Sequence, residues 1–121
     1  ITRVCDLEIA RTGLTEAEAD AAGFAYHTTT MESTTTAGYW PDAPEMRIKV
    51  VVERGSGRLL GAQVVGGPGA GKRVDVFATA LWNGMEASDL AWTDLAYAPP
   101  FSGVWDLIHI AARAGAEAAA G

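Results

Sequence analysis

The stretch that decides the fold runs from Gly61 to Leu81 and reads GAQVVGGPGAGKRVDVFATAL. Its first half is an apolar run that ends in glycines, and its second half carries apolar residues at helical spacing. Gly66, Gly71 and Lys72 also satisfy the G-x-x-x-x-G-K spacing of a nucleotide-binding phosphate loop. The class of protein therefore depends on whether this segment lies in a nucleotide-binding sheet.

The residues around the glycines argue against a phosphate loop. Such a loop needs Ser or Thr after its Lys to hold magnesium, and position 73 is Arg. It also follows a strand of a parallel sheet, whereas here the turn GSG (55–57) separates the preceding run from EMRIKVVVER (45–54), which predicts an antiparallel hairpin. We therefore interpret the segment as a Gly-rich entry to a packed helix, whose free backbone N–H groups could hold a small anion.

Length, charge and cysteine count limit the function further. The chain has 121 residues, enough for one domain, and carries a formal net charge of -6. Because its nine basic residues are scattered, we expect neither a nucleic acid nor an anionic membrane as a partner. Cys5 is the single cysteine, which excludes an internal disulfide and favours the reducing cytoplasm. No apolar run reaches the roughly 20 residues of a membrane-spanning helix.

Alternating segments predict the strands. Residues 3–10 alternate, which predicts a half-buried strand with Cys5, Leu7 and Ile9 on its apolar face, so that Cys5 is a buried packing thiol. The Thr-rich run 24–36 suits a second extended strand. In the predicted hairpin, the residues that face one way are Met46, Ile48, Val50 and Val52.

Three helices are predicted outside these strands. Thr15 and Glu18 stand at the spacing of a capping box, which predicts a short helix over residues 14–23. The last helix is expected from Ser102, as its cap, to Ala119. The helix between them starts at Arg73, ends at Gly84, and has an apolar stripe of Val74, Phe77, Ala78, Leu81 and Trp82.

This order of elements predicts the fold class. The strands come in a run, with a helix before them and helices after them, which favours an α+β fold over a doubly wound parallel sheet. We expect one domain with an antiparallel sheet of about four to five strands covered by helices.

Other side chains with chemical potential have structural interpretations. His27 and His109 are too few for a metal site and lack carboxylates or cysteines at ligand spacing. Ser102 lacks the G-x-S-x-G surroundings of a hydrolase nucleophile. The carboxylates that are close together in sequence are expected on solvated faces: Asp6, Glu8, Asp42 and Glu45.

Four tryptophans are many for a chain of this length, and tryptophan is enriched where surfaces are buried between subunits. Trp82 belongs to the apolar stripe of its helix, so we expect it to face the core or the sheet. Trp105 leads the last helix, and we expect it at a subunit interface. The other two are Trp40 and Trp92.

Two segments together resemble a known family: GRLLGAQVVGGPGAGKRVDVFATAL (57–81) and LAYAPPFS (95–102). They resemble the C-terminal dimerisation domain of the FAD- and NAD(P)H-dependent pyridine nucleotide-disulfide oxidoreductases. The nearest branch is that of coenzyme A disulfide reductase, NADH oxidase and NADH peroxidase. The resemblance extends from DLEIARTGLTEAEA (6–19) to the last helix.

The resemblance implies that the chain works as part of a larger enzyme. In the family, an FAD domain with the redox cysteine and an NAD(P)H domain precede this third domain, and their G-x-G-x-x-G fingerprints are not in this sequence. Residues 1–121 are thus expected to be a single dimerisation domain, a fragment of a three-domain flavoenzyme. It would form a homodimer, complete the partner's active site, bind no cofactor itself and be inactive alone. FAD and NAD(P)H would belong to the parent enzyme, and its substrate stays open between a disulfide, a peroxide, oxygen and a metal.

The resemblance also implies site residues. The His-Pro-x-x-x-Glu motif of the glutathione reductase branch is replaced here by Tyr-Ala-Pro-Pro at 97–100. In the coenzyme A disulfide reductase branch, two tyrosines of this domain face the partner's redox cysteine, and Tyr97 and Tyr39 stand at the matching places. A phenol can donate a hydrogen bond or a proton to a thiolate leaving group. The alternative is a free-standing α+β module that holds a small anion at the Gly-rich helix start.

Overall fold

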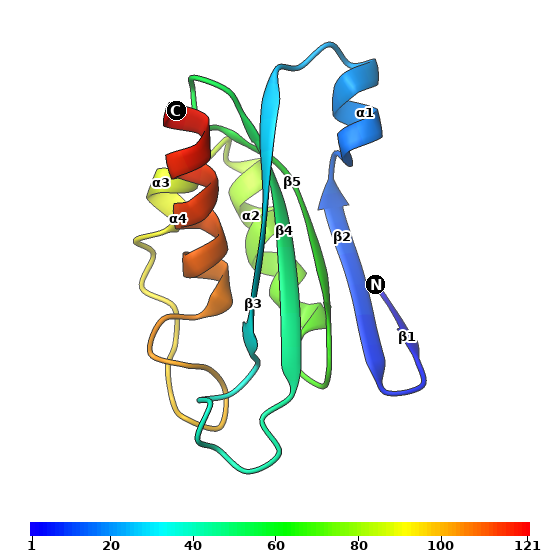
Figure 1. Cartoon of the computed structure of the whole chain (residues 1–121), viewed down its shortest axis with the longest axis vertical. Coiled ribbons are helices and arrows are strands. Elements are labelled where there is room, and N and C mark those ends of the chain that lie inside the picture. Colours follow the sequence, from blue (N-terminus) through cyan, green and yellow to red (C-terminus); the bar gives the residue numbers. More distant parts are fainter.

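The computed structural model describes residues 1–121 and has one five-stranded antiparallel sheet with the strand order β1-β2-β5-β4-β3. Figure 1 shows α2, α3 and α4 against one face of this sheet and α1 on the other side. The predicted α+β fold is confirmed. The strands are β1 (Thr2–Val4), β2 (Leu7–Gly13), β3 (Tyr26–Thr34), β4 (Glu45–Glu53) and β5 (Leu59–Gly66), and the helices are α1 (Glu16–Ala21), a short 3-10 turn η1 (Gly71–Arg73), α2 (Val74–Trp82), α3 (Ala87–Leu90) and α4 (Leu107–Ala120).

The hairpin of β4 and β5 is the centre of the sheet. The two strands pair antiparallel, with Ile48 opposite Val64 and Val50 opposite Ala62. Alternation along β4 directs four residues to the helix-covered face, and this predicted set is confirmed because all of them are buried: Met46, Ile48, Val50 and Val52.

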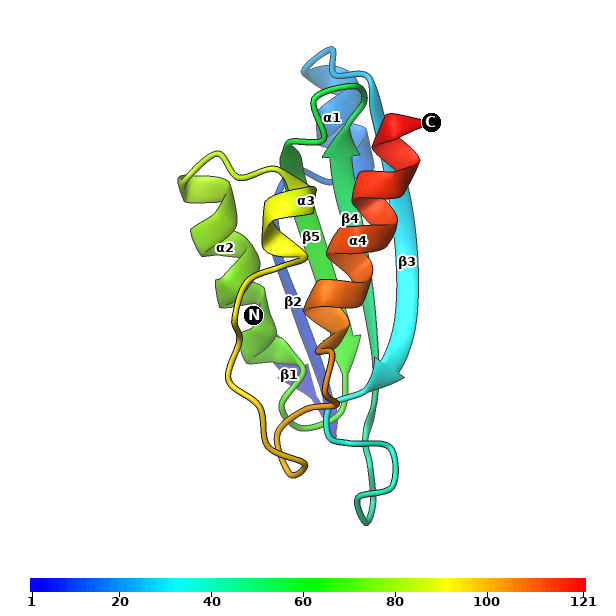
Figure 2. The same ribbon diagram turned by 90° about the vertical axis from the view of Figure 1, so that its left-hand side faces the viewer.

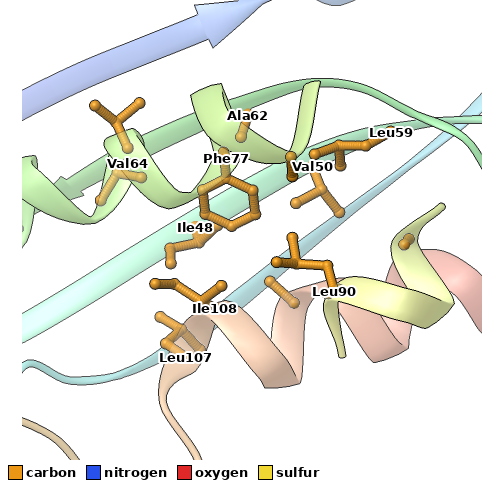
Figure 3. Packing of buried hydrophobic residues seen from close by; sticks show 14 of the residues in the cluster. Ile48, Val50, Leu59, Ala62, Val64, Phe77, Leu90, Leu107 and Ile108 are labelled. Atoms are coloured by element: carbon orange, nitrogen blue, oxygen red, sulfur yellow. The ribbon is translucent and has the colours of Figure 1, made fainter. Parts of the chain in front are cut away.

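The main core lies between the sheet and the three helices (Figure 3). The Phe77 ring of α2 is fully buried beside Ile48, and Leu107 and Ile108 at the start of α4 close the core from the other helix. Each such side chain contributes roughly 1.5–3 kcal/mol through the apolar surface it removes from water. These contacts fix where α2 and α4 begin relative to the sheet.

The approach of α4 to β4 depends on one glycine. A Cβ at Gly115 would lie 2.8 Å from Val52 Cγ2 and 3.0 Å from Val50 Cγ2, closer than carbon atoms pack. The absence of a side chain at Gly115 therefore lets the helix lie directly on the valines of the strand.

The helix α1 covers the opposite face of the sheet. As predicted, Thr15 caps it: the Thr15 hydroxyl accepts a hydrogen bond from the Glu18 N–H at 3.2 Å, and Gly23 follows with a left-handed φ of 81°. Buried Ala19 packs there with Val51 and Leu60 in a small second cluster.

The prediction of one strand over residues 3–10 with a buried Cys5 is wrong. β1 and β2 form a hairpin in which Val4 pairs with Leu7, so Cys5 and Asp6 are its two-residue turn. Cys5 has a left-handed φ of 55° and is exposed. The alternation of the sequence continues through the turn, which hides it from a periodicity argument.

Two further expectations about helices are corrected. The last helix begins at Leu107, with Asp106 as its cap, because the Asp106 carboxylate accepts the Ile108 N–H at 3.0 Å. Ser102 lies buried in the loop that precedes it. Trp82 is 90% exposed, because the helix α2 directs Phe77 and Ala80 to the core and turns its last residue outward.

Figures 1 and 2 both place two long loops at the same end of the molecule, at the bottom of each view. One joins β3 to β4 over residues 35–44, and the other joins α3 to α4 over residues 91–106. The Gly-rich segment 67–70, between β5 and η1, lies at this end as well. None of the helices combines the length and the hydropathy needed to span a bilayer.

Candidate functional site

Tyr97 and Tyr39, the two predicted site residues, lie together at the loop end although they come from different loops. Burial raises the pKa of the Tyr97 phenol above its ordinary value of 10.0, and the neighbouring Tyr39 phenol raises it further. Both effects favour the protonated form of the Tyr97 phenol. Both side chains still reach solvent, with exposed fractions of 47% for Tyr97 and 78% for Tyr39. A phenol that is protonated and accessible can donate to a group that approaches from outside.

Backbone hydrogen bonds join the two tyrosine-bearing loops. The Ala37 N–H donates to the Pro99 carbonyl at 2.9 Å, which ties residues two positions away from each tyrosine. Within the second loop, the Phe101 N–H donates to the Ala98 carbonyl at 2.8 Å and closes the turn around Pro100. The prolines fix the backbone φ of this turn and restrict its freedom further.

Large apolar side chains of the same two loops are also exposed. Trp105 packs edge-to-face on Trp92 with ring centroids 6.0 Å apart, and it packs on the His109 ring at 5.6 Å. Exposed apolar side chains that gather in one part of a surface are typical of interaction sites. We call the exposed apolar residues of these two loops the aromatic rim: Tyr39, Trp40, Trp92, Tyr97, Phe101, Val104 and Trp105.

The histidines have structural partners, as expected. The His109 Nδ1 accepts the Asp106 N–H at 3.1 Å, and its Nε2 lies 2.8 Å from the Thr93 carbonyl. Because a carbonyl only accepts, the ring is the neutral tautomer with its proton on Nε2. His27, in β3, accepts from Arg54 Nε at 3.2 Å. No group of His, Cys, Asp and Glu side chains is arranged to hold a metal ion.

The Gly-rich helix start is already occupied by a carboxylate of the chain. The Gly71 N–H donates to Glu8 Oε1 at 2.8 Å, and Lys72 pairs with Asp75. Glu8 was expected on a solvated face, and this contact corrects that prediction. A phosphate or another anion would meet the Glu8 carboxylate here, so the geometry does not favour the small-anion alternative. The strand before the loop is also antiparallel to its neighbours, which excludes a phosphate loop.

In the sequence, Arg73 breaks the phosphate-loop motif and marks the predicted start of a helix, and no site role is predicted for it. In the structure its guanidinium forms an ion pair with Asp106, with Nε 3.1 Å from each carboxylate oxygen. Both side chains are nearly buried, at 10% and 11% exposure, and they join the start of α2 to the start of α4. Sequence reasoning missed this pair because the two residues meet only in the folded chain.

Comparison with known proteins places this architecture in a family. Residues 1–107 match the family described as pyridine nucleotide-disulphide oxidoreductase, dimerisation domain. The NAD(P)H coenzyme A polysulfide/persulfide reductase of Pyrococcus horikoshii is 42% identical over 93% of this chain and 25% of its own length. The coenzyme A disulfide reductase of Staphylococcus epidermidis is 34% identical over 91% of this chain and 25% of its own length.

A solved structure agrees with these sequence matches. The NAD-dependent persulfide reductase from A. fulgidus superposes with a TM-score of 0.89 at 42% identity, over 93% of this chain and 21% of that protein. The chain thus spans about a quarter of the length of the curated relatives that it matches.

Proposed function

The chain belongs to the family of pyridine nucleotide-disulphide oxidoreductase dimerisation domains, and from this premise we propose that it pairs two copies of a longer flavoenzyme and completes each partner's active site. Its match to a quarter of each relative's length supports a role as one domain of such an enzyme. The pairing would be a symmetric homodimer in the cytoplasm. The exposed aromatic rim supports this proposal, because it presents apolar surface without a partner in the single chain.

The FAD and NAD(P)H of such an enzyme would be bound by other parts of the longer chain. The residues described here do not fit either group: the Gly-rich helix start donates its Gly71 N–H to Glu8, and the strand before it is antiparallel to both of its neighbours. We therefore derive no catalytic step through either cofactor from this domain.

The chemistry that we assign to the chain resides in the tyrosine pair. Tyr97 would donate a hydrogen bond or a proton to a thiolate that leaves when a disulfide, persulfide or polysulfide is reduced at the partner subunit. Tyr39, which lies beside the Tyr97 phenol, would orient it. A neutral phenol suits this task, because it stabilises a thiolate without placing a permanent charge in the site. The observation that carries the proposal is that two tyrosines from separate loops meet at an exposed end.

Mixed dimers of the full-length enzyme test whether the tyrosines act on the partner. One subunit would carry Tyr97→Phe together with Tyr39→Phe, and the other would lack the redox cysteine of the longer chain. Each homodimer would be nearly inactive with coenzyme A disulfide or polysulfide. Reassociated subunits should recover about one quarter of the wild-type rate, because half of the dimers are mixed and each has one intact site. Recovery no greater than the sum of the two homodimers would show that the tyrosines do not act in trans.

The isolated chain tests the pairing itself. Sedimentation equilibrium over a dilution series should show a dimer, and Trp105→Asp in the aromatic rim should shift it to monomer. Trp82→Asp is the matched control, since Trp82 is an equally large exposed side chain at the far end of α2. Equal effects of the two substitutions would argue against the aromatic rim as the contact.

A further inference from the structure

We propose that Arg73 is the positioning residue of the tyrosine pair: one buried guanidinium holds both tyrosine-bearing loops against the starts of α2 and α4. The relevance of this role to catalysis rests on the function proposed above for Tyr97 and Tyr39. The positioning itself can be tested in the chain alone.

The hydrogen bonds of Arg73 reach three separate loops. Its Nη2 donates to the Thr35 carbonyl and to the Phe101 carbonyl, each at 2.8 Å, and its Nη1 donates to the Gly69 carbonyl at 2.7 Å. Thr35 begins the loop that carries Tyr39, and Phe101 belongs to the loop that carries Tyr97. The same nitrogen atom therefore joins the backbones of both loops.

The Asp106 carboxylate fixes the direction in which the guanidinium points. It accepts from Arg73 Nε and also from the Ile108 N–H, so it is held by the first turn of α4. The charge of Arg73 is balanced in this way by a nearly buried partner. Its other hydrogen bonds go to backbone carbonyls, so Arg73 does not serve as a binding site for an external anion.

The planar fork of arginine is what this arrangement requires. The described bonds use one N–H on Nε, one on Nη1 and two on Nη2, directed at four different residues. A lysine presents its donors from one nitrogen and cannot reach carbonyls on opposite sides at once. The proposal therefore predicts that Arg73→Lys preserves the charge and loses the positioning.

Titration of the tyrosines tests the positioning through the pKa of Tyr97. In a Tyr26→Phe background, the phenolate absorbance reports only Tyr39 and Tyr97, because the chain has three tyrosines. Arg73→Lys should lower the pKa of Tyr97 toward 10.0, since loosened loops expose the ring and separate it from Tyr39. Arg47→Lys is the control, because Arg47 forms an exposed ion pair with Glu32 on the sheet and does not contact either loop. An unchanged Tyr97 titration in folded Arg73→Lys would overturn the proposal.

Chemical rescue separates positioning from a general loss of structure. Arg73→Ala should shift the Tyr97 titration in the same direction, and millimolar methylguanidinium should restore it by refilling the space between the carbonyls. If Arg73→Ala does not fold, Arg73→Lys, which retains the pairing with Asp106, decides the question. Failure of methylguanidinium to move the titration of a folded Arg73→Ala chain would contradict the proposal.

Kinetics of the full-length enzyme then connect positioning to catalysis. Arg73→Lys should lower kcat about 10-fold or more with little change in the KM for NAD(P)H, because a misplaced donor affects the reacting geometry. If Tyr97→Phe leaves kcat unchanged while Arg73→Lys shifts the titration, the proposed function of the tyrosines fails and the positioning role stands. If Tyr97→Phe lowers kcat and Arg73→Lys does not, the positioning role fails and the proposed function stands.

Discussion

Phe77 and Tyr97 mark two regions of this molecule that are built in opposite ways. Around Phe77, aliphatic side chains of the sheet and the helices fill a dry core, and each residue is held by many weak contacts. Around Tyr97, large rings remain exposed, and the loops are held by a few directed hydrogen bonds from Arg73 and the backbone. The fold and the candidate site therefore depend on different residues, so they can be disturbed separately.

The largest effect is expected in the core. Phe77→Ala removes a fully buried ring and should lower the free energy of unfolding by about 4 kcal/mol, measured by urea denaturation. Trp82→Ala on the same helix should change it by less than about 0.5 kcal/mol, because that ring is exposed. Equal losses for the two substitutions would contradict the assigned faces of α2.

Breaking the ion pair between Arg73 and Asp106 should have the second-largest effect on stability. Asp106→Ala leaves the Arg73 guanidinium nearly buried without its partner and should cost about 3 kcal/mol of stability. Asp75→Ala breaks the exposed pair with Lys72 and should cost less than about 1 kcal/mol. Thermal unfolding of both variants measures the difference. Comparable losses of stability would show that the Asp106 pair contributes no more than an exposed ion pair.

A side chain at Gly115, where α4 contacts β4, should have a smaller effect on stability. Gly115→Val forces atoms into the valines of β4 and should cost about 2 kcal/mol, measured by urea denaturation. Arg113→Val on the exposed side of the same helix carries only the lower helix propensity of valine, about 0.5 kcal/mol. If Gly115→Val and Arg113→Val lower the free energy of unfolding equally, α4 can move away from the sheet without a loss of stability.

The smallest effect is confined to the tyrosines. Tyr39→Phe removes the hydroxyl beside Tyr97 and should bring the pKa of Tyr97 closer to 10.0, while burial keeps part of the increase. Since the folded pKa is above the unfolded one, Tyr97 favours the fold below pH 10.0, and this contribution is lost as the pH rises through the folded value. Absorbance titration measures the change, and no change would mean that the two phenols do not interact.

The elements with strong local signals could be predicted from the sequence. Alternation in residues 45–54 located β4 and its buried face, and the capping residues around Thr15 located α1. The last helix was placed too early because Ser102 after two prolines is a suitable cap, whereas the actual cap, Asp106, follows four residues without helical structure. Local patterns therefore predicted the last helix correctly and its start wrongly, because both Ser102 and Asp106 are suitable caps.

The candidate site was only partly accessible from the sequence. A family resemblance predicts Tyr97 and Tyr39 as site residues, and no periodicity relates them. Arg73, Glu8 and Asp106 act through partners that are distant along the chain, so no local signal identifies their contacts. Cys5 illustrates the converse error, because a regular pattern continued through a tight turn.

The pairing of β2 with β5 has a consequence for how the chain folds. β3, β4 and β5 follow one another as neighbours, whereas β2 joins the sheet across the whole length of β3 and β4, with Ile9 opposite Val65. Closing this long loop costs entropy before the pairing is formed, so the meander of three strands can assemble before the N-terminal hairpin joins it. The Glu8 carboxylate arrives with β2, so the Gly-rich start of α2 receives its partner only when β2 pairs with β5.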